Sequence, residues 1–187
     1  MRPSNCPVLG YLQMDVKYVT SELSGLPYTC YLYAVMDIAT RYKVGLILPG
    51  VEEAGSLLAL YHAIQTLPFP VRYVQTDNGL EFQKRFHAKC EEVGLEHFYI
   101  HKSSPNDNAV IERSFRTDEE EFFFWLEKAP QDHLGLNTWY QRFLHTYDTV
   151  RPHMGINMLT PKRAIALYHK TWENKGTNKP RAARLRL

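Results

Sequence analysis

YLQMDVKYV (Tyr11–Val19) is the stretch that decides the fold, because its side chains alternate between apolar and polar with the period of a β-strand. The two kinds of side chain fall on opposite faces of such a strand: Leu12, Met14, Val16 and Tyr18 on one, and Gln13, Asp15 and Lys17 on the other. A strand with one fully apolar face needs a hydrophobic core packed against that face. The segment therefore predicts a sheet at the centre of the fold.

Two further strands are predicted directly after this one. Thr29–Ile38 is almost continuously apolar and β-prone, which is typical of a central strand that is buried on both faces. Tyr42–Leu48 follows after the short connection ATR and is stopped by Pro49-Gly50. Such a short connection implies that these two strands are antiparallel neighbours.

The apolar period changes after Gly50, and helices alternate with strands from there on. Helices are predicted over 51–67, 82–93, about 108–128, 133–148 and 161 to about 170, and strands over 71–76 and 95–101. This order predicts an α/β fold with a mixed five-stranded sheet. Three antiparallel strands are followed by two parallel ones, and helices flank the sheet.

The composition indicates one soluble globular unit and excludes several classes of protein. A chain of 187 residues, 44% of them hydrophobic, can form one core, and no apolar run approaches the roughly 20 residues that cross a bilayer. The start, MRPSNCPVLG, has no apolar stretch of signal-peptide length, and three widely spaced cysteines imply no disulfide framework. We therefore expect a cytoplasmic protein that has no membrane partner.

Three segments are expected along the chain: a lead-in at 1–10, a core with C-terminal helices at 11–170, and a basic tail at 171–187. The formal net charge of +2 is too small to indicate nucleic acid by itself. The last residues, KGTNKPRAARLRL, contain lysines and arginines but no acid. This tail is interpreted either as a solvated segment or as one that contacts phosphates.

Three carboxylates stand where a surface acid is not the default choice. Asp15 lies within the first strand, Asp77 follows the strand at 71–76, and Glu112 lies on a predicted helix, beside its apolar stripe. Hard divalent cations such as Mg²⁺ prefer oxygen ligands, and carboxylates from separate elements can hold two of them for phosphoryl transfer. The three acids are therefore candidate metal ligands.

Each acid can also be accounted for by ordinary structural roles. Asp15 could face solvent from an edge strand, and Asp77 opens an Asp-Asn-Gly sequence that is also a good turn. Glu112 could be an ordinary glutamate on a helix surface. The hypothesis of a site rests on the three occurring together.

The motifs around these acids resemble a known family. They are LQMDVKYV (Leu12–Val19), MDIATRY (Met36–Tyr42), QTDNGLEF (Gln75–Phe82), SSPNDNAVIERSFRT (Ser103–Thr117) and YDTVRPHMGINMLTPKRAI (Tyr147–Ile165). In this order and spacing they resemble the catalytic cores of the DDE recombinases, which are insertion-sequence transposases and retroviral integrases. The resemblance implies the ribonuclease H-like fold.

The resemblance also implies a chemistry and its residues. Asp15, Asp77 and Glu112 would be the catalytic acids and the ligands of two Mg²⁺ or Mn²⁺ ions, and the activity would be DNA cleavage and strand transfer at mobile-element ends. The other implied positions are Asn78 and Gly79, which would shape the site, and Asn108, Arg113 and Arg116, which would contact DNA. The implied partners are element-end and target DNA and further copies of the chain, as a homodimer or higher oligomer, at the nucleoid if the source is bacterial.

Some features depart from the family pattern and keep alternatives open. The interval between Asp77 and Glu112 is one residue shorter than usual, and nothing within these 187 residues has the pattern of a helix-turn-helix or a zinc module, as expected of an excised core or a stand-alone remnant. A ribonuclease H-like nuclease without joining activity is one alternative, and a domesticated DNA-binding or oligomerising module is another. The run EEEFFFWLE (Glu119–Glu127) places aromatics on more than one helix face, which predicts a second buried contact with the next helix or with a partner subunit.

Overall fold

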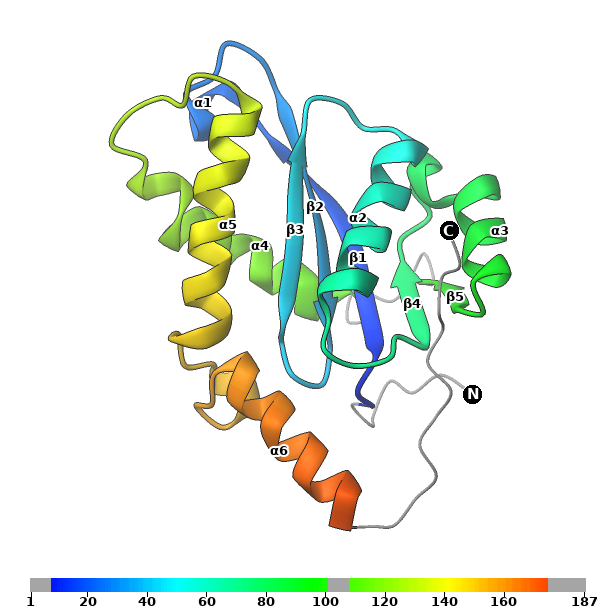
Figure 1. The fold of residues 1–187 in the computed structure, drawn as a ribbon. Helices are drawn as coiled ribbons and strands as arrows, with labels where there is room; N and C mark the ends of the chain where they lie inside the picture. Colours follow the sequence, from blue (N-terminus) through cyan, green and yellow to red (C-terminus); the bar gives the residue numbers. More distant parts are fainter. Residues whose placement is uncertain (1–7, 101–107, 175–187) are drawn as a thin grey trace.

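The computed structural model describes residues 8–100 and 108–174 (Figure 1). The lead-in up to residue 7, the linker at 101–107 with the predicted strand end at His101, and the basic tail from residue 175 lie outside the described residues. None of the helices in the described part of the chain is long and apolar enough to cross a bilayer.

A five-stranded sheet in the order β3-β2-β1-β4-β5 forms the centre of the fold. Its strands are β1 (Tyr11–Val19), β2 (Cys30–Asp37), β3 (Lys43–Leu48), β4 (Tyr73–Thr76) and β5 (Glu96–Tyr99). β1 pairs antiparallel with β2 and β2 with β3, whereas β4 pairs parallel with both β1 and β5. The predicted fold class, with three antiparallel strands followed by two parallel ones, is confirmed.

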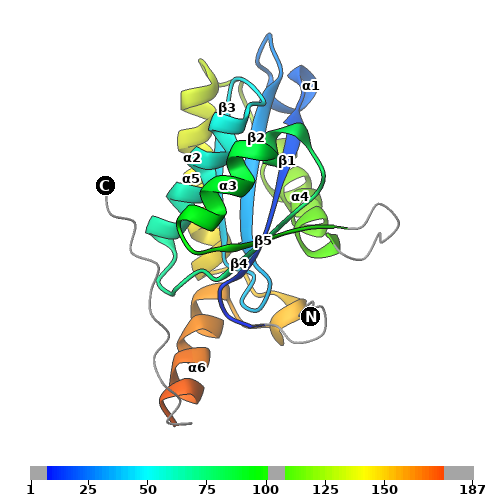
Figure 2. The ribbon, with the colours of Figure 1, turned by 90° about the vertical axis from the view of Figure 1, so that its right-hand side faces the viewer.

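Helices surround this sheet on both faces and along one edge. They are α1 (Ser21–Ser24), α2 (Glu53–Thr66), α3 (Lys84–Glu92), α4 (Ala109–Glu121), α5 (His133–Thr149) and α6 (Pro161–Asn174), with 3-10 turns η1 (Leu80–Phe82), η2 (Phe123–Trp125) and η3 (Met154–Ile156). α2 and α3 cover one face and α4 the other (Figure 2), while α5 runs beside the edge strand β3 (Figure 1).

The strands bury apolar side chains on both faces of the sheet, which gives two cores. Leu12 and Met14 of β1 lie in the core under α2 and α3, together with Leu60 and Phe86. The second core includes Leu32, Ile111, Phe115, Leu136 and Tyr140 and joins the sheet to α4 and α5. The polar side chains of β1 face this second layer, because residues alternate between the two faces of a strand.

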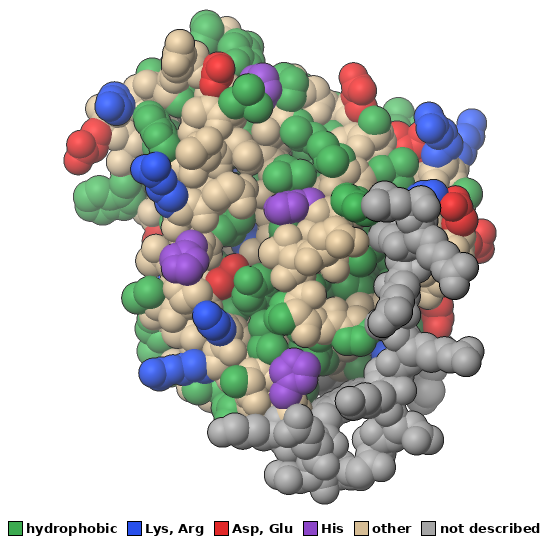
Figure 3. All heavy atoms as spheres, viewed as in Figure 1, with side chains coloured by type: hydrophobic (Ala, Val, Ile, Leu, Met, Phe, Trp, Pro, Cys, Tyr) green, Lys and Arg blue, Asp and Glu red, His purple; other side chains and the backbone are tan. Residues whose placement is uncertain are grey.

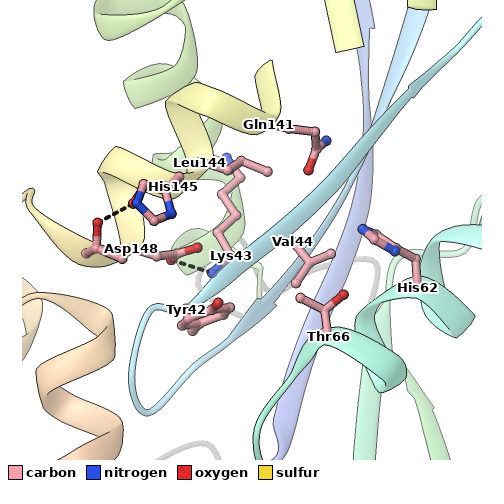
Figure 4. A pocket seen from close by; sticks show the side chains of 10 residues that line it. Tyr42, Lys43, Val44, His62, Thr66, Gln141, Leu144, His145 and Asp148 are labelled. Carbon is pink, nitrogen blue, oxygen red and sulfur yellow. Dashed lines mark hydrogen bonds between the residues drawn. The ribbon is translucent and has the colours of Figure 1, made fainter. Parts of the chain in front are cut away.

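The outer edge of β3 is closed by polar side chains of α5. The bonds run from Ile47 N to Asn137 Oδ1 (3.0 Å), from Gln141 Nε2 to the Gly45 carbonyl oxygen (2.8 Å), and from Lys43 N to Asp148 Oδ1 (3.0 Å; Figure 4). An open strand edge presents unpaired N–H and C=O groups that another chain can pair with. A hollow of about 180 Å³ remains between α5 and α2, lined by His62 and Thr66 among others.

The helix predicted over 108–128 is shorter than expected, because α4 ends at Glu121. Phe122 leaves the helical backbone (φ −126°, ψ −63°), and Phe122 and Phe123 both become buried against Tyr140, with ring centroids 5.3 and 6.5 Å away. Consecutive residues of a helix point about 100° apart, and the departure from the helix at Phe122 lets both rings pack in one core. The predicted contact with the next helix is thereby confirmed.

A buried ion pair fastens α4 to the edge of the sheet. The Lys43 ammonium donates to the Asp118 carboxylate, and neither side chain has any exposed surface. The ammonium also lies over the rings of Phe115 and Tyr147, 5.4 and 5.7 Å from their centroids. Burial lowers the pKa of Lys43 and raises the pKa of Asp118, and the attraction between the two charges opposes both shifts.

We predict that Lys43→Met destabilises the protein by roughly 3–5 kcal/mol, because the Asp118 charge is left buried without a partner. Adding Asp118→Leu should restore most of this loss, since the pair is then replaced by apolar groups. Urea unfolding of the wild type, both single variants and the double variant measures the effect. A double variant as unstable as the sum of the single variants would contradict the prediction.

Candidate active site

Asp15 and Asp77 lie at equivalent positions of neighbouring parallel strands. The register pairs Tyr11 with Tyr73 and Gln13 with Gln75. Continued two residues beyond Gln13 and Gln75, past the end of β4, the same register sets Asp77 beside Asp15. Both residues are an even number of positions from Gln13 or Gln75, so both side chains point to the face that α4 covers.

Gly10 fixes this register at the start of β1. Its carbonyl oxygen accepts hydrogen bonds from Arg72 N (2.9 Å) and Tyr73 N (3.2 Å), and its N–H donates to the buried Asp37 carboxylate (2.8 Å). The backbone is left-handed here (φ +87°), and a Cβ would lie 2.2 Å from the Pro70 carbonyl oxygen. Only glycine fits this contact, so Gly10 holds the start of β4 against β1 and aligns the two aspartates.

Glu112 comes to the site from the other layer, because α4 docks on the polar face of β1. Three polar residues of β1 each hold one point of the helix: Gln13 Oε1 accepts from Ile111 N (3.1 Å), Asp15 Oδ2 accepts from Asn108 Nδ2 (3.0 Å), and Lys17 Nζ donates to Glu119 Oε1 (2.6 Å). These bonds span the helix from its start almost to its end. They fix the first turn, which carries Glu112.

At the start of α4, a residue of β1 provides the capping bond that the N-cap residue usually provides. Asn108 is the N-cap, a position where an asparagine side chain usually accepts from an N–H of the first turn, but it makes no such bond. Gln13 satisfies the Ile111 N–H instead, which frees the Asn108 amide to hold Asp15. Asn108 is 2% exposed, and its Oδ1 has no hydrogen-bond partner among the described residues. The Asn108 side chain therefore binds the Asp15 carboxylate and does not cap the helix.

The electrostatics of the site centre on Asp15. Burial raises its pKa to about 7, a hydrogen bond from Val16 N opposes the shift, and the carboxylates of Asp77, Glu112 and Glu81 raise it further. Asp15, Asp77 and Glu112 make no ion pair with any residue at 8–100 or 108–174. The site thus concentrates negative charge that a cation would relieve.

Glu81 is a fourth acid that sequence reasoning missed. It lies in η1, half-buried, and its carboxylate packs over Gly79, where a Cβ would stand 2.7 Å from Glu81 Oε2. The sequence signal was the glutamate of TDNGLEF, four residues after Asp77. The helix predicted from Phe82 would not include Glu81, so the sequence did not place this side chain at the site. In the structure, η1 includes Glu81 and brings it near Asp15.

Asn78 and Gly79 form the turn beside the second aspartate, as their sequence suggests. Gly79 N donates to Asp77 Oδ1 (2.9 Å), which holds the carboxylate over its own turn. Asn78 Nδ2 donates to the Ile100 carbonyl oxygen (3.1 Å) and so joins the ends of β4 and β5. Asp77 is consequently held by the backbone rather than by a neighbouring side chain.

The donor set fits Mg²⁺ or Mn²⁺ in chemistry, because carboxylates are the hard oxygen ligands that these ions prefer. The carboxylates lie further apart than the ligands of an assembled metal centre. Within the described residues no group of three or more histidine, cysteine, aspartate or glutamate side chains lies close enough together to hold a metal ion. Glu112 stands in the first turn of α4, directly after the segment 101–107.

The candidate DNA contacts differ in their surroundings. Arg113 and Arg116 are exposed on α4, and Arg116 Nε donates to Glu120 Oε1 (2.6 Å), one turn along the same helix. Asn108 is buried and contacts Asp15, so it belongs to the interior of the site. On the α2 and α5 side, described cationic and anionic side chains are interspersed around an uncharged centre (Figure 3).

Comparisons with known proteins bear on the family and the fold of this chain. The family model of the integrase core domain matches residues 93–161, a segment that contains Glu112. A 39.2 kDa protein of insertion element IS476 from Xanthomonas euvesicatoria is 31% identical over 145 residues, which cover 75% of this chain. The chain spans less than half the length of the curated relatives it matches, 40% of this one and 46% of another.

Two solved structures show the same fold. The catalytic core domain of BIV integrase has a TM-score of 0.67 at 16% identity, covering 91% of this chain and all of that one. The HTLV-2 integrase catalytic core domain in complex with magnesium has a TM-score of 0.67 at 18% identity, covering 84% and 97%. The fold is the ribonuclease H-like fold of integrase cores. Together with the sequence matches, this identifies the chain as a DDE integrase or transposase core.

We predict that Asp15→Asn stabilises the metal-free protein at neutral and higher pH. The pKa of Asp15 is about 7 in the folded protein against an ordinary value of 3.8, so the folded state holds an extra proton between these values. Stability from this group is therefore full below pH 3.8 and is lost as the pH rises to 7 and beyond. The loss amounts to a few kcal/mol, since each pKa unit corresponds to about 1.4 kcal/mol.

Melting temperatures measured with chelator between pH 4 and 8 test this prediction. Asp15→Asn should flatten the fall that the wild type shows, whereas Glu120→Gln, a control at an exposed acid of α4, should leave the profile unchanged. Parallel profiles for the wild type and Asp15→Asn would show that folding does not raise the pKa of this carboxyl, and would contradict the prediction.

Proposed function

We propose that this chain is the catalytic core of a metal-dependent polynucleotidyl transferase that cleaves DNA at mobile-element ends and joins those ends to a target. The observation that carries the proposal is the register of β1 and β4, which sets Asp15 beside Asp77 on the face where α4 presents Glu112. The identification as an integrase or transposase core supports the same reaction class.

Asp15, Asp77 and Glu112 would hold two Mg²⁺ or Mn²⁺ ions. When bound, such a pair of ions supplies Lewis-acid stabilisation of the attacking and departing oxygens at the scissile phosphate. The chain itself contributes position: Asn108 Nδ2 orients the Asp15 carboxylate, and Gly79 N orients that of Asp77. Water would be the nucleophile for cleavage, and a DNA 3′-hydroxyl would be the nucleophile for joining.

The same proposal covers the partners. Element-end and target DNA would lie along the α4 side of the sheet, where Arg113 and Arg116 are exposed. The HTLV-2 integrase core is named in dimeric and trimeric forms, and we extend a homodimer or higher oligomer to this chain as part of the proposal. The whole reaction also requires end recognition, which this chain, at less than half the length of its curated relatives, need not supply alone.

A branched duplex that mimics the joined product gives the sharpest test. Resealing of the branch is strand transfer in reverse, so it needs the active site but no recognition of element ends. With Mn²⁺, Asp77→Asn and Glu112→Gln should each lower the rate by about a hundredfold or more, because a ligand to the ions is worth several kcal/mol in the transition state. Glu120→Gln, on the same helix, should retain the wild-type rate.

The products separate the possible functions. Resealing that both site variants lose supports the proposal. Nicking without resealing supports a ribonuclease H-like nuclease, and DNA binding without chemistry in the wild type supports a domesticated binding module. A rate unchanged in Asp77→Asn would overturn the assignment of the site.

We predict different effects for two of the residues that the family resemblance links to DNA. Asn108→Ala should lower the rate and the Mn²⁺ affinity about 10- to 100-fold at every salt concentration, because it removes the bond that orients Asp15. Arg116→Ala should weaken DNA binding and reduce its salt dependence by about one counterion, while the rate at saturating DNA is kept. Rates and binding isotherms between about 50 and 200 mM salt measure both effects. Equal salt dependence in the two variants would contradict the distinction.

A further inference from the structure

The segment HMGINML (His153–Leu159) forms a closed tip between α5 and α6. His153 and Leu159 form an isolated antiparallel bridge, with His153 N donating to the Leu159 carbonyl oxygen (2.9 Å). Met158 N donates back to the His153 carbonyl oxygen (2.9 Å), and η3 fills the loop between them. The tip is therefore defined by its own backbone and lies on the same side of the sheet as α4 (Figure 2).

The tip exposes two methionines at a strained point of the backbone. Met154 is 87% exposed and Met158 is 61% exposed. Asn157 (φ +56°) and Met158 (φ +59°) are consecutive left-handed residues, a conformation that favours glycine or asparagine and that methionine rarely adopts. Strain of this kind at an exposed apolar side chain persists only where the surroundings impose it, and it points to a role for the side chain.

The base of the tip is rigid. His153 is buried, its Nε2 lies 3.1 Å from the Tyr147 carbonyl oxygen, and its ring packs on the Tyr147 ring with centroids 4.4 Å apart. Arg151 forms two bonds with the Glu121 carboxylate (2.6 and 2.5 Å), which joins this segment to the end of α4. The Arg41 guanidinium lies under Gly155, 3.3 Å from where a Cβ would stand.

The exposed charges around the tip are mostly positive, with Glu121 paired to Arg151. No aspartate or glutamate occurs between Thr149 and Trp172, whereas this stretch contains Arg151, Lys162, Arg163 and Lys170. Lys162 and Arg163 are exposed in the first turn of α6, directly after the tip. A rigid apolar point flanked by exposed cations is complementary to a polyanion that has an apolar interior.

We propose that Met154 and Met158 form a wedge that inserts between base steps of duplex DNA, with Lys162 and Arg163 on the adjacent phosphates. Methionine is among the side chains that proteins insert from the minor groove to unstack and kink a duplex. The wedge deepens the proposed function and rests on it, because it assigns to the tip a way of deforming the DNA on which the proposed site acts. Two methionines fall well short of the roughly 800 Å² that each partner of a stable dimer buries, which favours DNA over a second copy.

Duplexes with 2-aminopurine at successive positions report the insertion, because unstacking this base raises its fluorescence. The 187-residue chain is titrated without divalent metal, so that binding is measured apart from catalysis. We expect a rise of severalfold at one or two positions, lost in Met158→Gly and in Met154→Ser and kept in Met154→Leu. Met158→Gly should melt no lower than the wild type, since glycine relieves the left-handed strain, and it thereby separates the wedge from folding.

The cation variants and the activity assay complete the test. The double variant Lys162→Gln/Arg163→Gln should bind DNA more weakly, and its binding should depend less on salt. The fluorescence rise at saturating DNA should be kept. Fluorescence that does not depend on the methionines overturns the wedge, and so does a change in the sedimentation of Met154→Ser, which would indicate a contact between copies. If the protein reseals branched DNA but its fluorescence does not depend on the methionines, only the wedge is overturned. The proposed function is then still supported.

Discussion

The polar face of β1 is the constraint on which the rest of the structure depends. A strand in the middle of a sheet places Gln13, Asp15 and Lys17 inside the protein, where each needs a partner. α4 supplies all three partners, so the same contacts that satisfy the strand also set the position and rotation of the helix. The buried pair of Lys43 and Asp118 then fixes the C-terminal half of α4 to the edge strand. Glu112 is held near the aspartates as a result.

At Asp15, this arrangement favours the proposed function at the expense of stability. The Asp15 carboxylate is buried beside other acids, and its raised pKa is the sign of that cost. A protein selected for stability alone would replace it with a neutral residue, since repulsion between like charges in a partly buried site is unfavourable. The physical reason for the cluster is therefore the charge that it can bind.

Much of the sheet was predictable because its signals are local. The strand at Tyr11–Val19 is confirmed residue for residue, since a strict alternation of apolar and polar side chains matches the two faces of a strand and no helical period. The end of α4 was missed because two adjacent phenylalanines enter one core, which the helical period does not foresee. The three acids were predicted as a set, but the alignment of the two aspartates depends on Gly10 and its contact with Arg72 and Tyr73, far along the chain. Asn108 owes its place to such a distant contact as well, through its bond to Asp15.

The cover on β3 has a consequence for how the protein is made. The side chains that close this edge lie 90 to 105 residues further along the chain than the backbone groups they bind. At about 5–20 residues per second, synthesis leaves the edge strand without its cover for roughly 5 to 20 seconds. During that interval the nascent sheet offers a free edge to any other emerging chain. Mispairing of β3 is therefore expected mainly during synthesis on crowded ribosomes, and not in the folded protein.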